Sequence, residues 1–289
     1  MAFDPFLYVA FGLGLLAGRV VRPKSPWVPR ATLLSIVVLV GLLGASLNSV
    51  GGTALLLEIP VALGFAVAVL ALTLGTYLVI ARLRSVPAPA AGGASPDGRL
   101  PVSLALLAAL VGGYALGHFV DLPTGVGIQW ALYALLALVA FDLKLQRKGL
   151  ENVWVPVSAA FVGALAAAGL FTVLVRVPLP SSLATATAFG FYSLAGPLVA
   201  ARAGAVLGLL AFLTNFLRED LTMLLAPVLG RRVRGEGVAA MGGATAMDTT
   251  LYFVTRYGDP DAGSLAIATG LLLTVVATLV VPAALALPT

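Results

Sequence analysis

The sequence predicts an all-α polytopic membrane protein, and three observations lead to this fold class. Of its 289 residues, 60% are hydrophobic and only 10% are charged, whereas about a quarter of the residues in a soluble domain are charged. The mean hydropathy is +1.06. That value comes from ten apolar runs, most of them close to the roughly 20 helical residues that cross a bilayer. Lipid is therefore the expected solvent for most of the chain.

The first six apolar runs are expected to cross the membrane one after another. The N-terminal segment carries Asp4 and no basic residue, unlike a secretory signal peptide, which favours a retained first helix with its N-terminus outside. The loops 19–30, 81–100 and 144–151 then lie inside and hold most of the Lys and Arg, as the positive-inside rule requires. The ten runs are 6–21, 31–47, 53–80, 101–119, 126–143, 153–175, 181–200, 203–229, 236–254 and 262–287.

The net charge of +5 does not indicate a nucleic-acid-binding protein. The basic residues form groups in short loops between apolar runs, and they do not form a basic face interleaved with exposed aromatic residues. The chain has no cysteine, which excludes disulfides and thiolate metal sites. The expected surroundings are the lipids of the cell membrane, which the chain crosses many times.

A segment rich in Pro, Gly and Ala, residues 84–100, is expected to be a cytoplasmic linker. It separates one three-helix segment, 1–83, from a second one, 101–176. Glycines recur early in both, as Gly-Leu-Leu-Ala-Gly at 14–18 and Val-Gly-Gly-Tyr-Ala-Leu-Gly at 111–117. Three crossings per copy would turn the second copy upside down, as in the inverted repeats of many secondary transporters. Residues 177–289 would then form the substrate-transport region.

The last four runs do not fit simple crossings, because those would place Arg231, Arg232 and Arg234 outside. Re-entrant hairpins at 181–200 and 236–254 repair the count, and both runs contain glycines that allow a bend. The predicted architecture is about eight transmembrane helices and two hairpins that enter from opposite sides and meet near the midplane, with both termini outside. Ten plain crossings are the competing arrangement, and they violate the charge rule.

Three polar clusters interrupt the last four runs. Ionisable groups at membrane depth cost a few kcal/mol or more, so they usually face a cavity or a partner. Arg218 and Glu219 either neutralise their neighbours as a buried structural pair or serve transport, and Asp248 in a glycine-rich bend favours transport. The candidate residues for substrate and proton binding are Tyr192, Ser193, Asn215, Arg218, Glu219, Thr245, Asp248 and, in an earlier run, Asp142.

Other polar residues have simpler interpretations. Asp142 could instead pair with Lys144 or Arg147 at the membrane interface, and Glu58 lies near a helix start, from which it can reach water. The one histidine, His118, lies at a helix end and is not expected to be a ligand. No nucleophile or metal set is present, and residues 190–196 lack the Gly-x-Ser-x-Gly pattern of a hydrolase. The sequence therefore predicts no enzyme, no metal and no cofactor.

The polar clusters resemble those of the LysO-type lysine exporters. The matching segments are Gly-Phe-Tyr-Ser-Leu-Ala-Gly at 190–196, Asn-Phe-Leu-Arg-Glu at 215–219 and Gly-Ala-Thr-Ala-Met-Asp at 243–248. Their order and spacing are similar to the family over about residues 180–287. Residues 138–143 carry a looser likeness that includes Asp142, and the rest of the first 150 residues match only in helix pattern. Asp220 departs from the family's pattern, which has an apolar residue there.

The resemblance implies export of L-lysine and close analogues, with essential intramembrane carboxylates. Glu219 and Asp248 could pair with the ammonium groups of lysine, while Arg218 or hairpin amides hold its carboxylate. Export of a cation against an inside-negative potential needs an energy source, and the chain has no nucleotide-binding motif, so proton antiport is expected. Asp248 or Glu219 would bind either a proton or lysine.

Other functions stay open from the sequence alone. An exporter of another cationic amino acid is the nearest alternative. A passive channel should have fewer tightly paired ionic groups in its lumen, and a structural membrane protein would use Arg218, Glu219 and Asp248 only for packing. Gly, Ala and Ser on many helices would also permit a homodimer.

Overall fold

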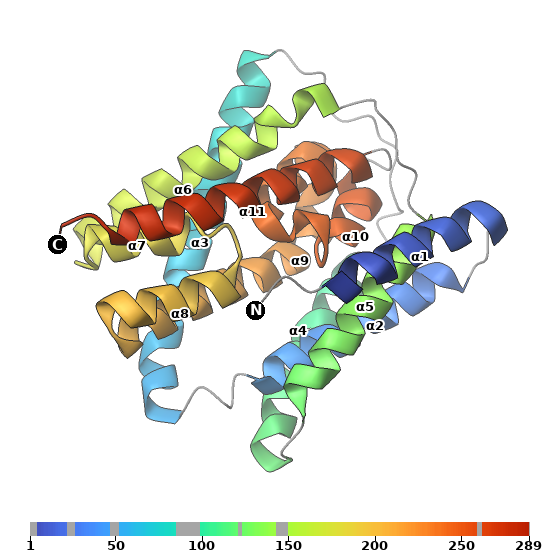
Figure 1. The fold of residues 1–289 in the computed structure, drawn as a ribbon, viewed down its shortest axis with the longest axis horizontal. Helices are drawn as coiled ribbons and strands as arrows, with labels where there is room; N and C mark the ends of the chain where they lie inside the picture. The colour runs from blue at the N-terminus through green and yellow to red at the C-terminus, as the bar shows by residue number, and fades with distance from the viewer. Residues whose placement is uncertain are drawn as a thin grey trace. The chain divides into compact units, whose positions relative to one another are not determined.

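The computed structural model describes residues 5–21, 27–46, 52–84, 99–120, 123–142, 150–258 and 262–288. Within these ranges the regular structure is entirely helical, and no strand occurs in them (Figure 1). Three described stretches are long and apolar enough to cross a membrane, namely Leu57–Leu83, Leu150–Leu174 and Gly263–Leu285. The prediction of a helical membrane protein is therefore confirmed.

Contacts between helices divide the chain into two compact units. The first unit is formed by Met1–Gly51 and Ser95–Leu145, and the second by Gly52–Ala94 and Gln146–Thr289. Each predicted three-helix segment thus gives its first two helices to the first unit and its third helix to the second. The predicted division at 1–83, 84–100, 101–176 and 177–289 stays a prediction about repeats in the chain.

The first unit is a group of four helices that pack along one another. Its helix α1 packs along α5, and α2 packs along α4 and α5. Glycines bring the backbones together, because a side chain at Gly14 would meet the backbone of Ala137 and one at Gly113 would meet the backbone of Gly41. The four helices are α1 (Pro5–Val21), α2 (Val28–Ser46), α4 (Arg99–Phe119) and α5 (Thr124–Asp142).

The second unit contains the three membrane-length stretches and the segments that break into short helices. Helix α3 packs along both α6 and α9, and α8 packs along α9. Its elements are α3 (Gly52–Leu83), η3 (Leu150–Asn152), α6 (Trp154–Leu174), α7 (Leu179–Ala186), α8 (Tyr192–Ala203), α9 (Ala205–Gly242), η4 (Gly243–Met247), α10 (Leu251–Phe253), η5 (Val254–Gly258) and α11 (Gly263–Leu285).

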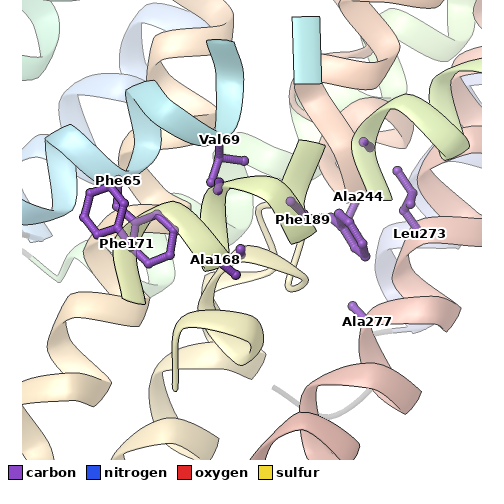
Figure 2. Packing of buried hydrophobic residues seen from close by; sticks show 12 residues of the cluster. Phe65, Val69, Ala168, Phe171, Phe189, Ala244, Leu273 and Ala277 are labelled. Atoms are coloured by element: carbon purple, nitrogen blue, oxygen red, sulfur yellow. The ribbon is translucent and has the colours of Figure 1, made fainter. Parts of the chain in front are cut away.

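The core of the second unit joins α3, α6 and α11 to two bends, one after α7 and one at the 3-10 helix η4. The rings of Phe65 and Phe171 stack with centroids 3.9 Å apart. Figure 2 shows Phe189, from the bend after α7, beside Ala244 from the bend after α9, close to Leu273 of α11. Alanines on α6 leave room for this close approach. The two bends are therefore part of the packed interior of the unit.

The contact between α3 and α6 depends on Gly163, and we expect Gly163→Val to destabilise the protein. A Cβ at this position would lie 2.5 Å from the backbone N and Cα of Thr73. Overpacking of this kind typically costs about 1–3 kcal/mol. The measurement is the thermal unfolding midpoint of purified protein in detergent.

Gly169→Val is the matched control, because Gly169 lies on the same helix and a Cβ there would meet nothing within 4 Å. Equal unfolding midpoints for the two variants would contradict the predicted close contact.

Candidate functional site

The predicted run 181–200 folds back on itself. Helices α7 and α8 are joined by residues 187–191, where Phe189 and Gly190 have φ of 54° and 94°. A cavity of about 430 Å³ is lined by Pro178, which precedes α7, by Ser181 in α7 and by Arg202 at the end of α8. Since both ends of the segment reach one cavity beside the C-terminal end of α11, residues 179–203 form a hairpin, called here the first hairpin.

A second hairpin follows a break inside α9. The helical geometry is interrupted at Arg234, where φ is 58° and ψ is 177°. The chain then returns beside its own preceding part, because Arg218 Nη2 donates to the carbonyl of Ala240 at 3.3 Å and Thr222 Oγ1 to that of Met241 at 3.2 Å. A Cβ on Gly258 would lie 2.6 Å from Cα of Gly235. Residues 235–258, the second hairpin, therefore begin and end at the same place.

The tips of the two hairpins, residues 187–191 of the first and 243–250 of the second, contact each other. The backbone N–H of Ala244 donates to the carbonyl of Phe189 at 2.8 Å, and a Cβ on Gly190 would lie 3.4 Å from Cγ2 of Thr245. The hairpins open in opposite directions along the part of α9 that precedes the break at Arg234, since the first lies against Gly208 and the second against Gly230. The backbone therefore turns back at a tip in each of these two runs.

Asn215 fixes the tip of the first hairpin. Its Oδ1 accepts a bond of 2.8 Å from the N–H of Gly190, and its Nδ2 donates to the carbonyls of Thr185 at 2.9 Å and Ala211 at 3.0 Å. The side chain is only 1% exposed. Both the oxygen and the nitrogen of the side-chain amide are hydrogen-bonded to backbone groups. Asn215 therefore holds the backbone of the first tip in place rather than offering free groups to a ligand.

Arg218 points to the tip of the second hairpin. Its side chain is 1% exposed, and Gly243 lies directly against its guanidinium, at a backbone φ of 67° that favours glycine. Within the described residues, Nε and Nη1 have no hydrogen-bond partner, and Arg218 forms no ion pair with Glu219. The guanidinium therefore keeps two nitrogens, Nε and Nη1, that can donate to another group.

Three carboxylates and a tyrosine lie around the same stretch of α9. Glu219 and Asp220 are 2% and 3% exposed, and Asp248 at the second tip is half-buried. Oδ1 of Asp248 accepts bonds from the N–H of Thr249 at 2.6 Å and from its hydroxyl at 3.2 Å. Tyr192 interacts electrostatically with all three carboxylates. The sequence-predicted Tyr192, Arg218, Glu219 and Asp248 are thus brought together.

The stripe of α9 that carries Glu219 also holds two aromatic residues. The ring of Tyr192 meets Phe212 and Phe216 edge-on, with centroids 5.3 and 5.9 Å apart. Phe212, Phe216 and Glu219 follow at helical spacing, so they share one face. The sequence interpretation missed these rings and Thr249, although the i, i+4 spacing of the two phenylalanines was a readable signal.

Other predicted residues differ in their placement. Thr245 donates to the carbonyl of Gly242 at 3.0 Å and lies 3.5 Å from the hydroxyl of Thr250, so it holds the second tip in shape. Ser193 lies in α8 and Asp142 is the last residue of α5, and the side chains of both lie outside the described part of the structure. Asp142 belongs to the first unit, and its position relative to the site is not defined.

The arrangement is suited to binding a cation. Three carboxylates and one guanidinium lie in this region, and all except Asp248 are nearly fully buried, so an opposite charge on a ligand is strongly favoured there. In the described ranges no three His, Asp or Glu side chains come close enough together to hold a metal ion.

The chain is similar to known exporters. The family profile described as "Lysine exporter LysO" matches residues 107–285. The protein named "Lysine exporter LysO" from Escherichia coli strain K12 is 32% identical over 193 residues, which span 62% of this chain and 62% of that protein. A Haemophilus influenzae protein named as a proposed lysine exporter is 27% identical over 179 residues, 57% of this chain and 89% of that protein. No solved structure matches the chain.

We expect Asn215→Ala to loosen the first tip. The substitution leaves the N–H of Gly190 and the carbonyl of Thr185 without their partner in a buried place, and each such loss costs about 1–3 kcal/mol. The unfolding midpoint should fall, and hydrogen exchange at residues 187–191 should accelerate.

Thr214→Val is the control, because the neighbouring Thr214 hydroxyl is buried and has no hydrogen-bond partner among the described residues. It should leave both measurements nearly unchanged. If Asn215→Ala behaved like Thr214→Val, Asn215 would not be the anchor of the tip.

Proposed function

The chain belongs to the lysine exporter LysO family, and from this premise we propose that it is a secondary active transporter that exports L-lysine and close analogues from the cytoplasm. The observation that carries this proposal is the meeting of two opposed hairpin tips beside buried carboxylates on α9. Broken helices with charged groups at their bends are the usual substrate sites of secondary transporters.

The geometry supports a bound lysine with its charges matched group by group. Glu219 and Asp248 would pair with the two ammonium groups. The Nε and Nη1 donors of Arg218, which have no partner among the described residues, would hold the lysine carboxylate. Tyr192 faces the same carboxylates and would line the site. An exporter of another cationic amino acid would use the same arrangement and is the second candidate.

The proposed energy source is proton antiport. Moving one positive charge out against 100 mV costs about 2.3 kcal/mol. A carboxylate that binds either a proton or the lysine ammonium couples the two movements, because occupation by one excludes the other. Asp248 and Glu219 are the candidates for this exchange, and Asp248 is the more accessible of the two. A passive channel or a purely structural protein would need no such carboxylate.

We further propose eight membrane spans with both termini outside. In this topology the end of α3 and the start of α6 are cytoplasmic, and Nη2 of Arg84 donates to Oδ1 of Asn152 at 2.6 Å. Tyr77, near the same end of α3, lies beside Gly237 at the open end of the second hairpin. The pairs α1 with α5 and α4 with α2 are the ones that an inverted repeat would interchange. A homodimer stays a prediction.

Lysine counterflow in proteoliposomes tests the activity. Vesicles loaded with unlabelled lysine should accumulate labelled L-lysine, in preference to D-lysine, and the rate should respond to a pH gradient. Asp248→Asn and Glu219→Gln should each reduce this transport by at least 10-fold, because a buried amide cannot neutralise an ammonium group. Glu58→Gln is the control, since Glu58 is a partly exposed carboxylate on α3.

Absence of lysine counterflow by folded wild-type protein would reject lysine as the substrate and lead to ornithine and arginine. Full activity of Asp248→Asn would remove Asp248 from the exchange.

The proposed topology can be read by labelling single cysteines, since the chain has none of its own. Cysteine at Pro178, at Ala203 or at Arg232 would be treated in intact cells with a membrane-impermeant thiol reagent. The first two positions flank the first hairpin and should both react from outside, whereas Arg232→Cys should react only after permeabilisation. Reaction of Pro178→Cys and Ala203→Cys from opposite sides would instead support a plain crossing.

A further inference from the structure

Asp220 is a buried carboxylate that the proposed lysine site does not use. It follows Glu219 on α9, its side chain is 3% exposed, and neither of its oxygens has a hydrogen-bond partner among the described residues. Its isolation is unusual, because buried charges in proteins are nearly always paired and hydrogen-bonded. A carboxylate in this position persists either as the protonated acid or beside a cation.

No described Lys or Arg side chain is a hydrogen-bond partner of Asp220, although three arginines lie on the elements packed around α9. Helices α6, α7 and α11 contain no ionisable side chain. The ionisable groups on the other neighbouring elements are Tyr192 and Arg202 of α8, Glu58, Tyr77 and Arg82 of α3, Asp248 after η4, Tyr252 of α10, and Arg256 and Tyr257 of η5.

The described groups that interact electrostatically with Asp220 are acidic or phenolic. Tyr192 and Glu219 both interact with it. Arg218, two positions before Asp220, directs Nη2 to the carbonyl of Ala240 and lies against Gly243 instead. The one cation that the proposed function brings to this region is the substrate itself.

We propose that Asp220 is a second proton-carrying carboxylate, so that two protons enter for each lysine cation that leaves. This inference rests on the proposed function. In the loaded state Asp220 is ionised together with the exchanging carboxylate, and the positive charge of the bound lysine stabilises both. When lysine leaves to the outside, each of the two groups binds one external proton, and both protons are released to the cytoplasm before the next lysine binds.

The number of protons decides whether the membrane potential drives export. Exchange of one proton for one lysine cation moves no net charge. With two protons, one net positive charge enters per cycle, and a potential of 100 mV, inside negative, changes the attainable lysine ratio by about 50-fold. Asp220 would therefore make export respond to voltage as well as to the pH gradient.

The experiment measures the lysine distribution across proteoliposomes holding the full chain. Potentials are set by potassium gradients with valinomycin, at equal pH on both sides and separately with a pH gradient. Wild-type protein should shift the steady-state lysine ratio by about 50-fold per 100 mV. Asp220→Asn should keep a response to the pH gradient, at a lower rate, and lose the response to voltage. Asp220→Glu should restore the voltage response, and Glu58→Gln should behave as wild type.

Each outcome decides between the claims. A wild-type protein that responds to pH but not to voltage overturns the second proton and leaves proton antiport intact. A voltage response retained by Asp220→Asn overturns the assignment to Asp220. A wild-type protein that responds to neither gradient overturns proton antiport itself. If Asp220→Asn does not fold, the change of the wild-type steady-state lysine ratio with voltage gives the proton number, and a ratio that does not change with voltage, which means one proton, overturns the inference.

Discussion

The structure depends on one constraint, which is that two broken helices must satisfy their freed backbone groups without water. In a membrane interior an unpaired N–H or C=O costs several kcal/mol. The two tips solve this together with α9, because Phe189 accepts from the N–H of Ala244, Asn215 bonds Gly190 and Thr185, and Thr222 bonds Met241. Residues 215–222 of α9 therefore bond to both hairpins, and the candidate site lies along this same stretch.

This constraint also explains the residue types that surround the site. The tips can approach only if small residues stand between the helices, as Ala184, Ala188 and Ala195 do near the first tip. Phe189 adopts a positive φ, which costs energy for a side chain of its size. Its ring is fully buried against residues of α6, and this burial favours the strained backbone. Packing and backbone bonding thus fix the tips before any ligand is considered.

Much of this arrangement could be predicted from the sequence because its signals are local. Charges within apolar runs, glycines at the bends and basic residues at 231–234 predicted the hairpins, and the family resemblance is confirmed by the match at 107–285. The partners of α5 could not be predicted, since a nearly uniform apolar helix carries no preferred face. Whether Arg218 and Glu219 pair was also beyond the sequence. Adjacent helical residues point about 100° apart, and only the folded tip shows that the guanidinium turns to Ala240.

The contacts that hold the hairpins to α9 differ in strength from the contact between the two tips, and the difference bears on how such a site can open. Two side chain to backbone bonds attach the first hairpin to α9 through Asn215, and two more attach the second through Arg218 and Thr222. Among the described residues the tips share one backbone bond, from the N–H of Ala244 to the carbonyl of Phe189, whereas each attachment to α9 has two bonds. Detaching a hairpin from α9 would expose a buried charge or amide, whereas parting the tips exposes mainly small and apolar groups. The contact between the tips is therefore the weaker joint, and separation there leaves each hairpin on its support.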